Sequence, residues 1–375
     1  MEFRDLKAQY QYLKNDIDKA VLQVMQEGNF ISGHQVTELE EQLADYVGVK
    51  HCITCGNGTD ALVLALMAWN IGIGDAVFVP DFTFFASAEA PAILGATPVF
   101  VDVDDRTFNI SPTDLEEAIQ EVIKEGKLVP KVVIAVDLFG QPAEYPKILE
   151  IAKKYNLLVL EDGAQGFGGA IGEKKACSFG DIATTSFFPA KPLGCYGDGG
   201  AIFTDDDVWA ELLKSYRIHG KGNNKYDNVR IGMNSRLDTI QAAILQIKLK
   251  IFEEYELQQV NSIAEQYGTR LKDVVRVPII NKQYVSSWAQ YTILCKDQGE
   301  RENIQKSLKV ANIPSMIYYE KGLHEQKAFK ENYKAMGNYE NTMSIKKKVL
   351  SLPIGPYMKE EQVEETIDKI LSVFR

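Results

Sequence analysis

The sequence predicts an α/β protein in which a large domain, built on a mostly parallel β-sheet with helices on both faces, precedes a smaller α+β domain. Short apolar segments alternate with segments of helical spacing along residues 51–160, which is the pattern of a parallel sheet. Beyond residue 250 the strand and helix patterns lose this regular alternation. We therefore expect residues 1–250 to form the large domain with its N-terminal helices, and residues 251–375 to form the small domain.

The N-terminal elements follow from the spacing of apolar residues. Helices are predicted at 6–25 and 37–47, the second with a capping box formed by Thr37 and Glu40, and a loop at 28–33 separates them.

The sheet itself begins with a strand at 51–54. The turn 56–60 leads from it into a helix at 61–69 that is apolar on every side, as a buried helix is. Further strands are expected at 77–79, 98–102, 131–136, 157–160 and 183–188, and further helices at 86–94, after the capping residue Ser111, and at 145–155, 206–215 and 237–255.

The small domain is expected to mix short elements without a long parallel series. Strands are predicted at 291–295 and 314–319, and helices at 301–310 and 359–374, the last an amphipathic helix that closes the chain.

The composition excludes a nucleic-acid or membrane surface. The 375 residues carry a net charge of −11, whereas a nucleic-acid-binding protein would present a basic face. The longest apolar run, residues 61–69, is about half of what a membrane span needs. The first residues, MEFRDLKAQY, lack the apolar core and the cleavage site of a signal peptide. We expect a cytoplasmic protein.

The five cysteines fit the same compartment, because an odd number in a chain of this length does not indicate a disulfide framework. Cys52 and Cys55 have the spacing of a zinc or redox pair, but no second such pair follows and the chain has only four histidines. We expect buried thiols at a strand end here, and no metal site.

The stretch 157–204 puts two reactive side chains at the ends of strands. Asp162 follows the strand at 157–160, and Lys191 follows the strand at 183–188. Both would lie at the carboxyl edge of the sheet, where ligands bind in open α/β folds.

A carboxylate and a lysine at this edge are typical of a site for pyridoxal 5′-phosphate (PLP). A buried lysine that loses its proton forms a Schiff base with the cofactor aldehyde, and a carboxylate keeps the ring nitrogen protonated. A surface lysine near a strand-end aspartate explains the spacing too, so the spacing alone leaves both interpretations open.

Two further segments suit such a ligand. The turn that contains Gly58, Thr59 and Asp60 precedes a helix, whose free N–H groups and dipole attract an anion such as a phosphate. Such turns are common in α/β proteins. Of the phenylalanines in residues 82–85, one could stack on a planar ring, and core packing is the alternative for each.

Residues 217–236 form a basic loop in an acidic chain. Five basic residues stand against one acidic residue, Asp227, among glycine, asparagine and tyrosine. Such a loop suits a diphosphate or carboxylate substrate, and a solvated flexible loop explains the composition equally well. The basic residues are Arg217, Lys221, Lys225, Arg230 and Arg236.

Several of these segments together resemble the DegT/DnrJ/EryC1/StrS family of sugar aminotransferases. The resemblance is carried by SFFPAKPLGCYGDGGAIFT, by EDGAQ before it and by RIGMNSRLDTIQAAIL after it, and it extends from FRDLKAQY to LSLPIGPYM. It implies the PLP-dependent transferase fold type I, which is the aspartate aminotransferase-like fold. One departure is Gly163, where the family usually has alanine, so that looser packing beneath the cofactor ring is expected.

The resemblance also implies roles for individual residues. Lys191 and Asp162 would be catalytic, with Lys191 binding the cofactor aldehyde and then acting as general base. Phe84 would cover the cofactor ring, and Gln165 would bond its phenolic oxygen. The implied cofactor-binding residues are Gly58, Thr59, Asp60, Phe84, Asp162, Gln165, Ser186, Lys191 and Asn234, and the implied substrate-binding residues are Arg236, Tyr318, Tyr319 and His219. For His219, an exposed or structural histidine is the alternative.

Enzymes of this family act on nucleotide-linked keto sugars, with PLP and its aminated form PMP as carriers of nitrogen. The resemblance is nearest to enzymes that aminate the 3-keto group of a UDP-N-acetyl-glucuronic acid derivative for surface polysaccharide, and L-glutamate is the implied donor. It further implies a homodimer whose active sites are shared, with Asn234 reaching the cofactor phosphate of the neighbouring subunit. A dTDP-, UDP- or GDP-linked 3- or 4-keto-6-deoxy sugar is the alternative substrate.

Three alternative functions compete with sugar amination. Family members that eliminate water carry histidine in place of the lysine, which Lys191 argues against. An NAD-dependent oxidoreductase would fit a doubly wound sheet, but neither Gly56-Asn57-Gly58 nor Gly166-Phe167-Gly168 completes G-x-G-x-x-G at a strand-to-helix turn. A non-catalytic regulator with this fold would not need both Asp162 and Lys191.

Overall fold

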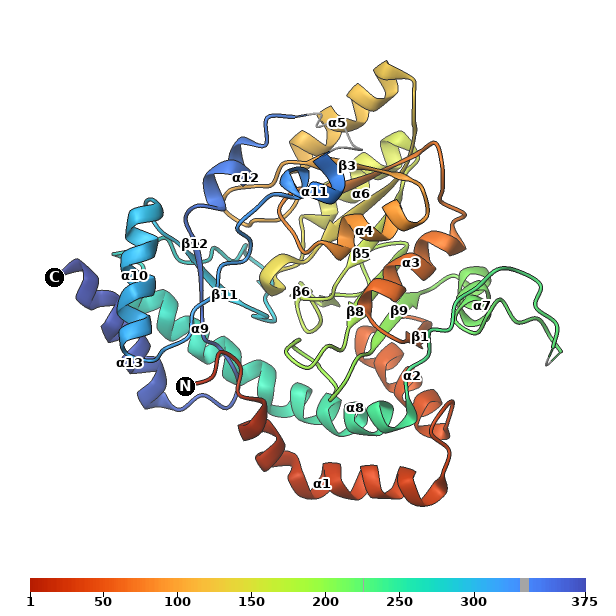
Figure 1. The fold of residues 1–375 in the computed structure, drawn as a ribbon, viewed down its shortest axis with the longest axis horizontal. Coiled ribbons are helices and arrows are strands. Elements are labelled where there is room, and N and C mark those ends of the chain that lie inside the picture. Colours follow the sequence, from red (N-terminus) through yellow and green to blue (C-terminus); the bar gives the residue numbers. More distant parts are fainter. Residues whose placement is uncertain (225, 331–336) are drawn as a thin grey trace.

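A seven-stranded sheet forms the centre of the molecule. The structure is a computed structural model that describes residues 1–224, 226–330 and 337–375 (Figure 1), so that Lys225 of the basic loop lies outside the described residues. Only β9 runs antiparallel to its neighbours, which confirms the mostly parallel sheet. In spatial order the strands are β1 (His51–Cys55), β9 (Gly200–Thr204), β8 (Ile182–Ser186), β5 (Leu158–Asp162), β4 (Val129–Val136), β2 (Asp75–Pro80) and β3 (Thr97–Val101).

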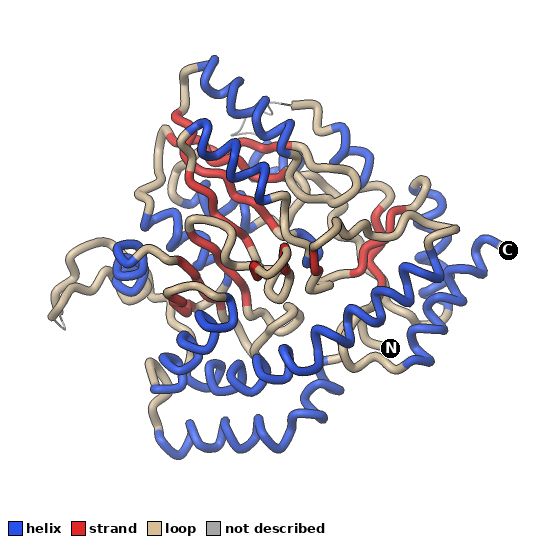
Figure 2. The backbone as a smooth tube through the Cα atoms, turned by 180° about the vertical axis from the view of Figure 1, so that it is seen from behind, coloured by secondary structure: helices blue, strands red, loops and turns tan. Residues whose placement is uncertain are grey.

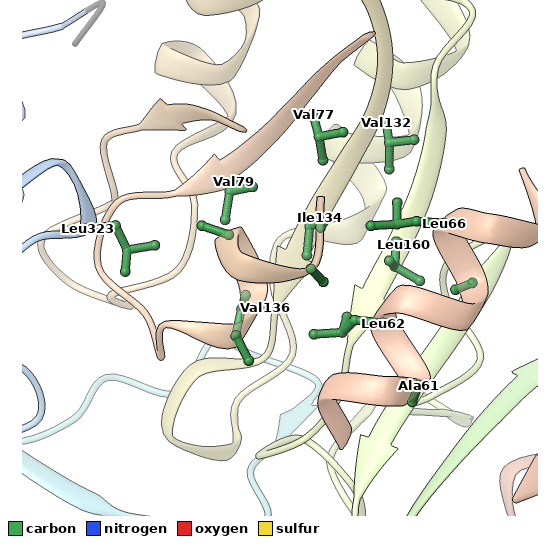
Figure 3. Packing of buried hydrophobic residues seen from close by; sticks show 14 of the residues in the cluster. Ala61, Leu62, Leu66, Val77, Val79, Val132, Ile134, Val136, Leu160 and Leu323 are labelled. Carbon is green, nitrogen blue, oxygen red and sulfur yellow. The ribbon is translucent and has the colours of Figure 1, made fainter. Parts of the chain in front are cut away.

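Helices cover both faces of this sheet (Figure 2). On one face α3 (Gly58–Ala68) packs its Leu62 and Leu66 against Val77, Ile134 and other residues of β2, β4 and β5 (Figure 3). On the other face lie α5 (Pro112–Glu125) and α6 (Tyr145–Tyr155), in a second apolar cluster. This two-sided burial is the reason why the strands read as continuous apolar runs in the sequence.

Several predicted helix starts differ from the structure, among them those of α2 (His34–Val47) and α3. The helix α2 begins before Thr37, so the predicted capping box is wrong: Gly33 precedes the helix, and the Oγ1 of Thr239 accepts its N–H at 3.1 Å. The helix α3 begins at Gly58 because Asn57 caps it by accepting the N–H of Asp60 at 2.8 Å. By contrast, Ser111 caps α5 as predicted.

One helical run joins the sheet to the C-terminal part of the chain. It consists of α8 (Thr239–Ile251), a wide π-turn η2 (Phe252–Glu256) and α9 (Leu257–Leu271). The predicted end at residue 255 is therefore wrong, because the turn widens there without breaking the helix. The N-terminal helix α1 (Leu6–Glu27) lies alongside α8 (Figure 1).

The C-terminal part has its own apolar core, formed by α9, α10 (Gln298–Val310), α13 (Glu360–Leu371) and the antiparallel pair β11 (Tyr291–Leu294) and β12 (Val349–Leu352). The strand predicted at 314–319 is wrong, since only Met316 forms a single bridge, to Ser351. The division into domains at residue 250 stays a prediction.

Several short elements were not predicted. They are the small sheet of β6 (Ala170–Ile171), β7 (Lys174–Lys175) and β10 (Tyr284–Val285), and the helices α11 (Lys327–Lys330) and α12 (Glu340–Ile345). The remaining helices of the large sheet are α4 (Ala86–Ile93) and α7 (Asp207–Tyr216). Across the described parts of the chain, none of the helices combines the length and apolarity that crossing a bilayer requires.

Candidate active site

Four aspartates stand where neighbouring parallel strands end, and two of them bind the returning C-terminal segment. Asp81, after β2, accepts the backbone N–H of His324 at 2.9 Å and lies 2.7 Å from its ring Nδ1. Asp102, after β3, accepts the backbone N–H groups of Asn341 and Thr342. Both carboxylates thus hold the C-terminal segment in place. The other two are Asp137 and Asp162.

Asp137 forms a buried acid pair with Glu161 of β5. The Oδ1 of Asp137 accepts the Ala143 N–H at 3.0 Å and the Tyr145 hydroxyl at 2.9 Å, while its Oδ2 has no donor among the described atoms. Burial raises the pKa of both carboxyls, that of Glu161 to about 7. A proton held between the two acids would provide the missing donor.

We expect Asp137→Asn to flatten the pH dependence of stability. Because the folded pair has a raised pKa, the stabilisation it contributes is complete below about pH 4 and is lost as the pH rises through about 7. An amide at position 137 offers a permanent donor to Glu161. Between pH 5 and pH 8, urea unfolding should show a loss of stability that is about 1–3 kcal/mol larger in the wild type than in the variant, which keeps the buried Glu161 but not the acid at position 137. Equal losses in both proteins would contradict the shared proton.

Asp162 ends β5 and is only 5% exposed. Its Oδ2 accepts the hydroxyl of Ser87, in α4, at 2.7 Å, and its Oδ1 accepts the N–H of Ala164 at 3.3 Å. Burial raises the pKa of Asp162, and Ser87 and then Lys191 oppose that shift. The carboxylate is thus buried with few partners, and a cationic ligand group would compensate its charge.

Lys191 lies in a tight loop after β8, near enough to Asp162 for the two charges to interact. The loop is closed by the hydrogen bonds from Lys191 N–H to the Phe188 carbonyl and from Cys195 N–H to the Phe187 carbonyl, each 2.8 Å. Burial lowers the pKa of Lys191, Asp162 opposes this shift, and the guanidinium of Arg4 adds to it. The amine is therefore biased toward its neutral, nucleophilic form.

The start of α3 forms a cradle for an anion. Its first N–H groups, those of Gly58 and Thr59, have no acceptor within the helix, and Asn57 caps only that of Asp60. Ser186 at the end of β8 lies beside them, since a Cβ on Gly58 would be 2.7 Å from the Cβ of Ser186. The cradle thus combines two amides and a hydroxyl at a helix N-terminus, as phosphate binding requires.

The side chain of Asp60 points to the loop that follows. Its Oδ2 accepts the hydroxyl of Ser235 at 2.6 Å, and the same hydroxyl accepts the N–H of Gly56 at 2.9 Å. Ser235 stands between Asn234 and Arg236 in the chain. Asp60 therefore ties the start of α3 to this segment, and its contact with a cofactor stays a prediction.

Aromatic side chains border the site. Phe84 is 55% exposed, so a face of its ring is open to a planar ligand. Phe82 is fully buried and packs edge-on against Tyr319 at 5.9 Å between ring centroids, and Tyr319 contacts Tyr318 at 5.7 Å. This contrast in exposure agrees with the assignment of Phe84, and not Phe82, to a ring.

The side chain of Gln165 forms two hydrogen bonds within the protein. Its Oε1 accepts the Phe139 N–H at 2.7 Å, and its Nε2 donates to the Tyr319 hydroxyl at 3.2 Å. The amide nitrogen has a second N–H, which remains for a ligand oxygen. Gln165 thus joins the strand ends to the segment that carries Tyr319.

The packing at Gly163 is tighter than expected. A Cβ at this position would lie 2.6 Å from the Sγ of Cys177 and 3.1 Å from the Thr184 carbonyl. The cysteine thiol occupies the space that alanine would need, so the expectation of looser packing is wrong.

The remaining predicted residues lie around a separate groove. Arg236 and His219 line an open groove of about 940 Å³ together with Lys221 and Arg230. The loop that forms it projects beyond α7, away from the centre of the molecule (Figure 1). Asn234 is exposed on the same segment and pairs only with Ile218 in an isolated bridge. The groove is basic, as an acidic ligand requires.

Cys52 and Cys55 do not form a dithiol site. They belong to two different apolar clusters, and both thiols are free and buried. In the described part of the chain, no group of three or more His, Cys, Asp or Glu side chains is arranged to hold a metal ion.

Three residues of the site escaped sequence reasoning: Ser87, Asp137 and Arg4. Ser87 donates to Asp162 across 75 positions of the chain, and Arg4 donates to Pro192, the residue after Lys191, across 188 positions. Asp137 had a usable signal, because it follows the apolar run of β4 as Asp162 ends that of β5.

Similarity to known proteins extends over almost the whole chain. A model of the DegT/DnrJ/EryC1/StrS aminotransferase family matches residues 11–371. The chain is 44% identical to a Pseudomonas aeruginosa protein named UDP-2-acetamido-2-deoxy-3-oxo-D-glucuronate aminotransferase, over 97% of this chain and 98% of that protein. It is 40% identical to a pleiotropic regulatory protein of Geobacillus stearothermophilus (99% and 98%) and 38% identical to a dTDP-3-amino-3,6-dideoxy-alpha-D-galactopyranose transaminase of Aneurinibacillus thermoaerophilus (99% and 98%).

Solved structures share the fold. A DegT DnrJ EryC1 StrS aminotransferase from Brucella abortus superposes with a TM-score of 0.96 at 48% identity, covering 99% of each chain. The Bacillus subtilis protein ntda, solved with bound PMP, has a TM-score of 0.88 at 28% identity, covering 99% of this chain and 83% of that one.

Proposed function

Because the chain belongs to the DegT/DnrJ/EryC1/StrS aminotransferase family, whose members are PLP-dependent sugar aminotransferases, we propose that it transfers an amino group from L-glutamate to the keto group of a nucleotide-linked sugar. The observation that carries the proposal is the pair of Asp162 and Lys191 at the carboxyl edge of the sheet, beside a cradle for a phosphate. When bound, PLP accepts nitrogen from one substrate, gives it to the other, and withdraws electrons from the carbon that loses a proton.

Lys191 has two tasks in this proposal. Its neutral amine would hold the aldehyde of the cofactor until the donor amine takes its place. As a free amine, Lys191 would then take the proton from the Cα of the donor, and in the second half of the reaction it would give a proton to the carbon of the sugar keto group.

The other residues orient the cofactor. The carboxylate of Asp162 would hold the proton of the ring nitrogen, and the hydrogen bond from Ser87 favours the ionised carboxylate and fixes its position. The N–H groups of Gly58 and Thr59 and the hydroxyl of Ser186 would bind the phosphate, and the free N–H of Gln165 would bind the phenolic oxygen. The open face of Phe84 would cover the ring.

We expect Ser87→Ala to weaken PLP binding by about tenfold, because a hydrogen bond to a charged group is lost and the pKa of Asp162 rises further. The measurement is the amount of PLP that stays with the protein at a series of free concentrations in dialysis. Thr83→Val is the matched control, since the Thr83 hydroxyl lies 3.4 Å from that of Ser87 without contacting Asp162. An equal loss in the control would argue against a specific role for Ser87.

The basic groove is proposed as the site for the acidic part of the substrate. Arg236 and His219 line it, and Tyr318 and Tyr319 would face the sugar from the other side. We propose a homodimer in which the groove of one subunit, with Asn234, completes the site of the other. The five free cysteines support the cytoplasm as the compartment.

The sugar is proposed from the relatives. The identity of 44% to a UDP-linked 3-oxo-glucuronate aminotransferase favours UDP-N-acetyl-3-oxo-glucuronic acid, made for surface polysaccharide or other glycans. A dTDP-, UDP- or GDP-linked 3- or 4-keto-6-deoxy sugar is the second candidate, and the identity of 38% to a dTDP-sugar transaminase favours it. Membership of an aminotransferase family sets aside the NAD-dependent alternative.

One experiment tests both parts of the proposal. Protein with PLP is incubated with L-glutamate until its yellow absorption is lost, and the glutamate is then removed. A panel of nucleotide-linked keto sugars is offered next, and return of the yellow form identifies the acceptor. We expect the UDP-linked 3-oxo-glucuronate to restore it. Recovery only with a 4-keto-6-deoxy sugar would overturn the choice of sugar, and no bleaching by any amino acid would overturn the transfer itself.

A further inference from the structure

A buried cluster of charges lies behind the loop that carries Lys191. The guanidinium Nη2 of Arg4 donates to the carbonyl of Pro192, the residue after Lys191, at 3.2 Å. Its Nη1 is buried without a hydrogen-bond partner among the described atoms. Arg4 belongs to the segment before α1, so the first residues of the chain contact the backbone of the candidate catalytic loop directly.

The same cluster contains one acid and a second buried cation. Glu256, in η2, is 2% exposed, and its Oε1 accepts the Gln9 amide and the Tyr357 hydroxyl, each at 2.8 Å. Lys248, in α8, is 1% exposed and stands 4.8 Å from the ring centroid of Tyr196. Burial lowers the pKa of Lys248 to about 8, Glu256 opposes this, and Arg4 adds to it.

The cluster holds more basic than acidic groups, and this imbalance affects the protonation of its lysines. Arg4 and Lys248 bring two cations into a buried region that has one acid, Glu256, and Lys191 is a third basic group near it. Arginine does not lose its proton in proteins. Repulsion between like charges therefore lowers the pKa of the lysines and leaves the arginine charged. The charged groups that act on Lys191 are Asp162, from β5, and Arg4. Burial is the main cause of the lowered pKa of Lys191, Asp162 opposes it, and Arg4 adds a smaller contribution in the direction of burial.

We propose that Arg4 is a positioning residue for the reaction: through the carbonyl of Pro192 it fixes the backbone of the loop that carries Lys191, and it places a permanent positive charge at that loop. This inference rests on the proposed function, in which Lys191 binds the cofactor aldehyde. Only the neutral amine can do so, and the lowered pKa of Lys191 increases the fraction that is neutral. The N-terminal segment would thus contribute to the site through the backbone of the loop that carries Lys191.

The test measures the titration of Lys191 in the full-length protein without cofactor. Trace acetylation with acetic anhydride from pH 6 to 11, followed by mass spectrometry, gives the reactivity of Lys191 relative to that of surface Lys147 in the same molecule. For Arg4→Met we expect the apparent pKa of Lys191 to rise by about 0.5–1 unit, so that its reactivity at pH 7 falls about three- to tenfold. We also expect faster amide hydrogen exchange in residues 187–197.

Further variants separate charge from packing. Arg4→Lys keeps the charge and should retain the wild-type titration, whereas Arg4→Gln keeps a donor without charge and should titrate as Arg4→Met does. Arg301→Met removes an arginine of α10 whose side chain is only 11% exposed, and it should leave Lys191 unchanged. If Arg4→Met does not fold, the comparison of Arg4→Lys with Arg4→Gln still tests the effect of the charge. Identical titration of Lys191 in these two variants would overturn the proposal.

This outcome is independent of the proposed function. A wild-type protein whose Lys191 titrates like a surface lysine overturns the role of Arg4, even if the protein binds PLP and transfers nitrogen. A protein that does not take up PLP overturns the proposed function, whatever the titration of Lys191.

Discussion

Lys191→Ala is expected to lower turnover by about 10⁴-fold, which is a larger loss than we expect for any other single substitution. The variant loses both the amine that binds the cofactor aldehyde and the base that moves the proton of the donor Cα. Borohydride reduction followed by mass spectrometry provides a second readout: the wild-type chain should gain the mass of the reduced cofactor at the peptide with Lys191. The variant should gain none.

Two controls make this result specific. Lys191→Arg keeps the positive charge, but it should be as inactive as alanine, because arginine does not form the neutral amine. Lys147→Ala removes a lysine at the surface of α6 and should leave turnover unchanged. Normal transfer of nitrogen by either variant at position 191 would refute the role of Lys191.

Asp162→Asn is expected to have the second largest effect, a loss of about 10²- to 10³-fold in turnover. A neutral amide can still bond Ser87, so the fold should persist, but it cannot hold a proton on the ring nitrogen. The loss should therefore fall on kcat more than on the amount of cofactor bound. Single-turnover bleaching of the yellow form by L-glutamate measures it directly.

The matched control is Asp181→Asn. Asp181 precedes β8 and accepts the Val159 N–H at 2.8 Å, so it lies at the opposite edge of the same strands. Its replacement should leave bleaching by L-glutamate unchanged. If Asp162→Asn bleached as fast as the wild type, the carboxylate would have no part in the chemistry, and the site would have to be assigned differently.

The sequence predicted the large sheet well for a physical reason. Strands buried on both faces read as continuous apolar runs, and the helices between them show their own spacing. The same signal fails where an element has few residues or does not end in a breaker. Strands of two residues, such as those of the β6, β7 and β10 sheet, are too short to show a period, and η2 continues the helix with ordinary polar residues.

The residues of the candidate site also differ in whether a local sequence pattern identifies them. Asp162 was predictable because it follows an apolar run, and Lys191 because it follows another within a proline- and glycine-rich loop, whereas Ser186 came only from the family resemblance. Ser87 and Arg4 act on them from distant parts of the chain, through single contacts that leave no local pattern. The family resemblance, now confirmed across residues 11–371, supplied the distinction between Phe84 and its neighbours, which periodicity could not.

The wide turn of η2 also sets the rotation of α9 about the helix axis relative to α8. A π-turn holds one residue more than an α-helical turn, and each residue of a helix advances by about 100°. Deleting one residue between Phe252 and Glu256 would thus rotate all of α9 by that angle and carry fully buried Tyr267 toward water. Insertions and deletions, which surface loops tolerate, are therefore barred from this segment, because its length is part of the geometry that aligns the C-terminal core with the sheet.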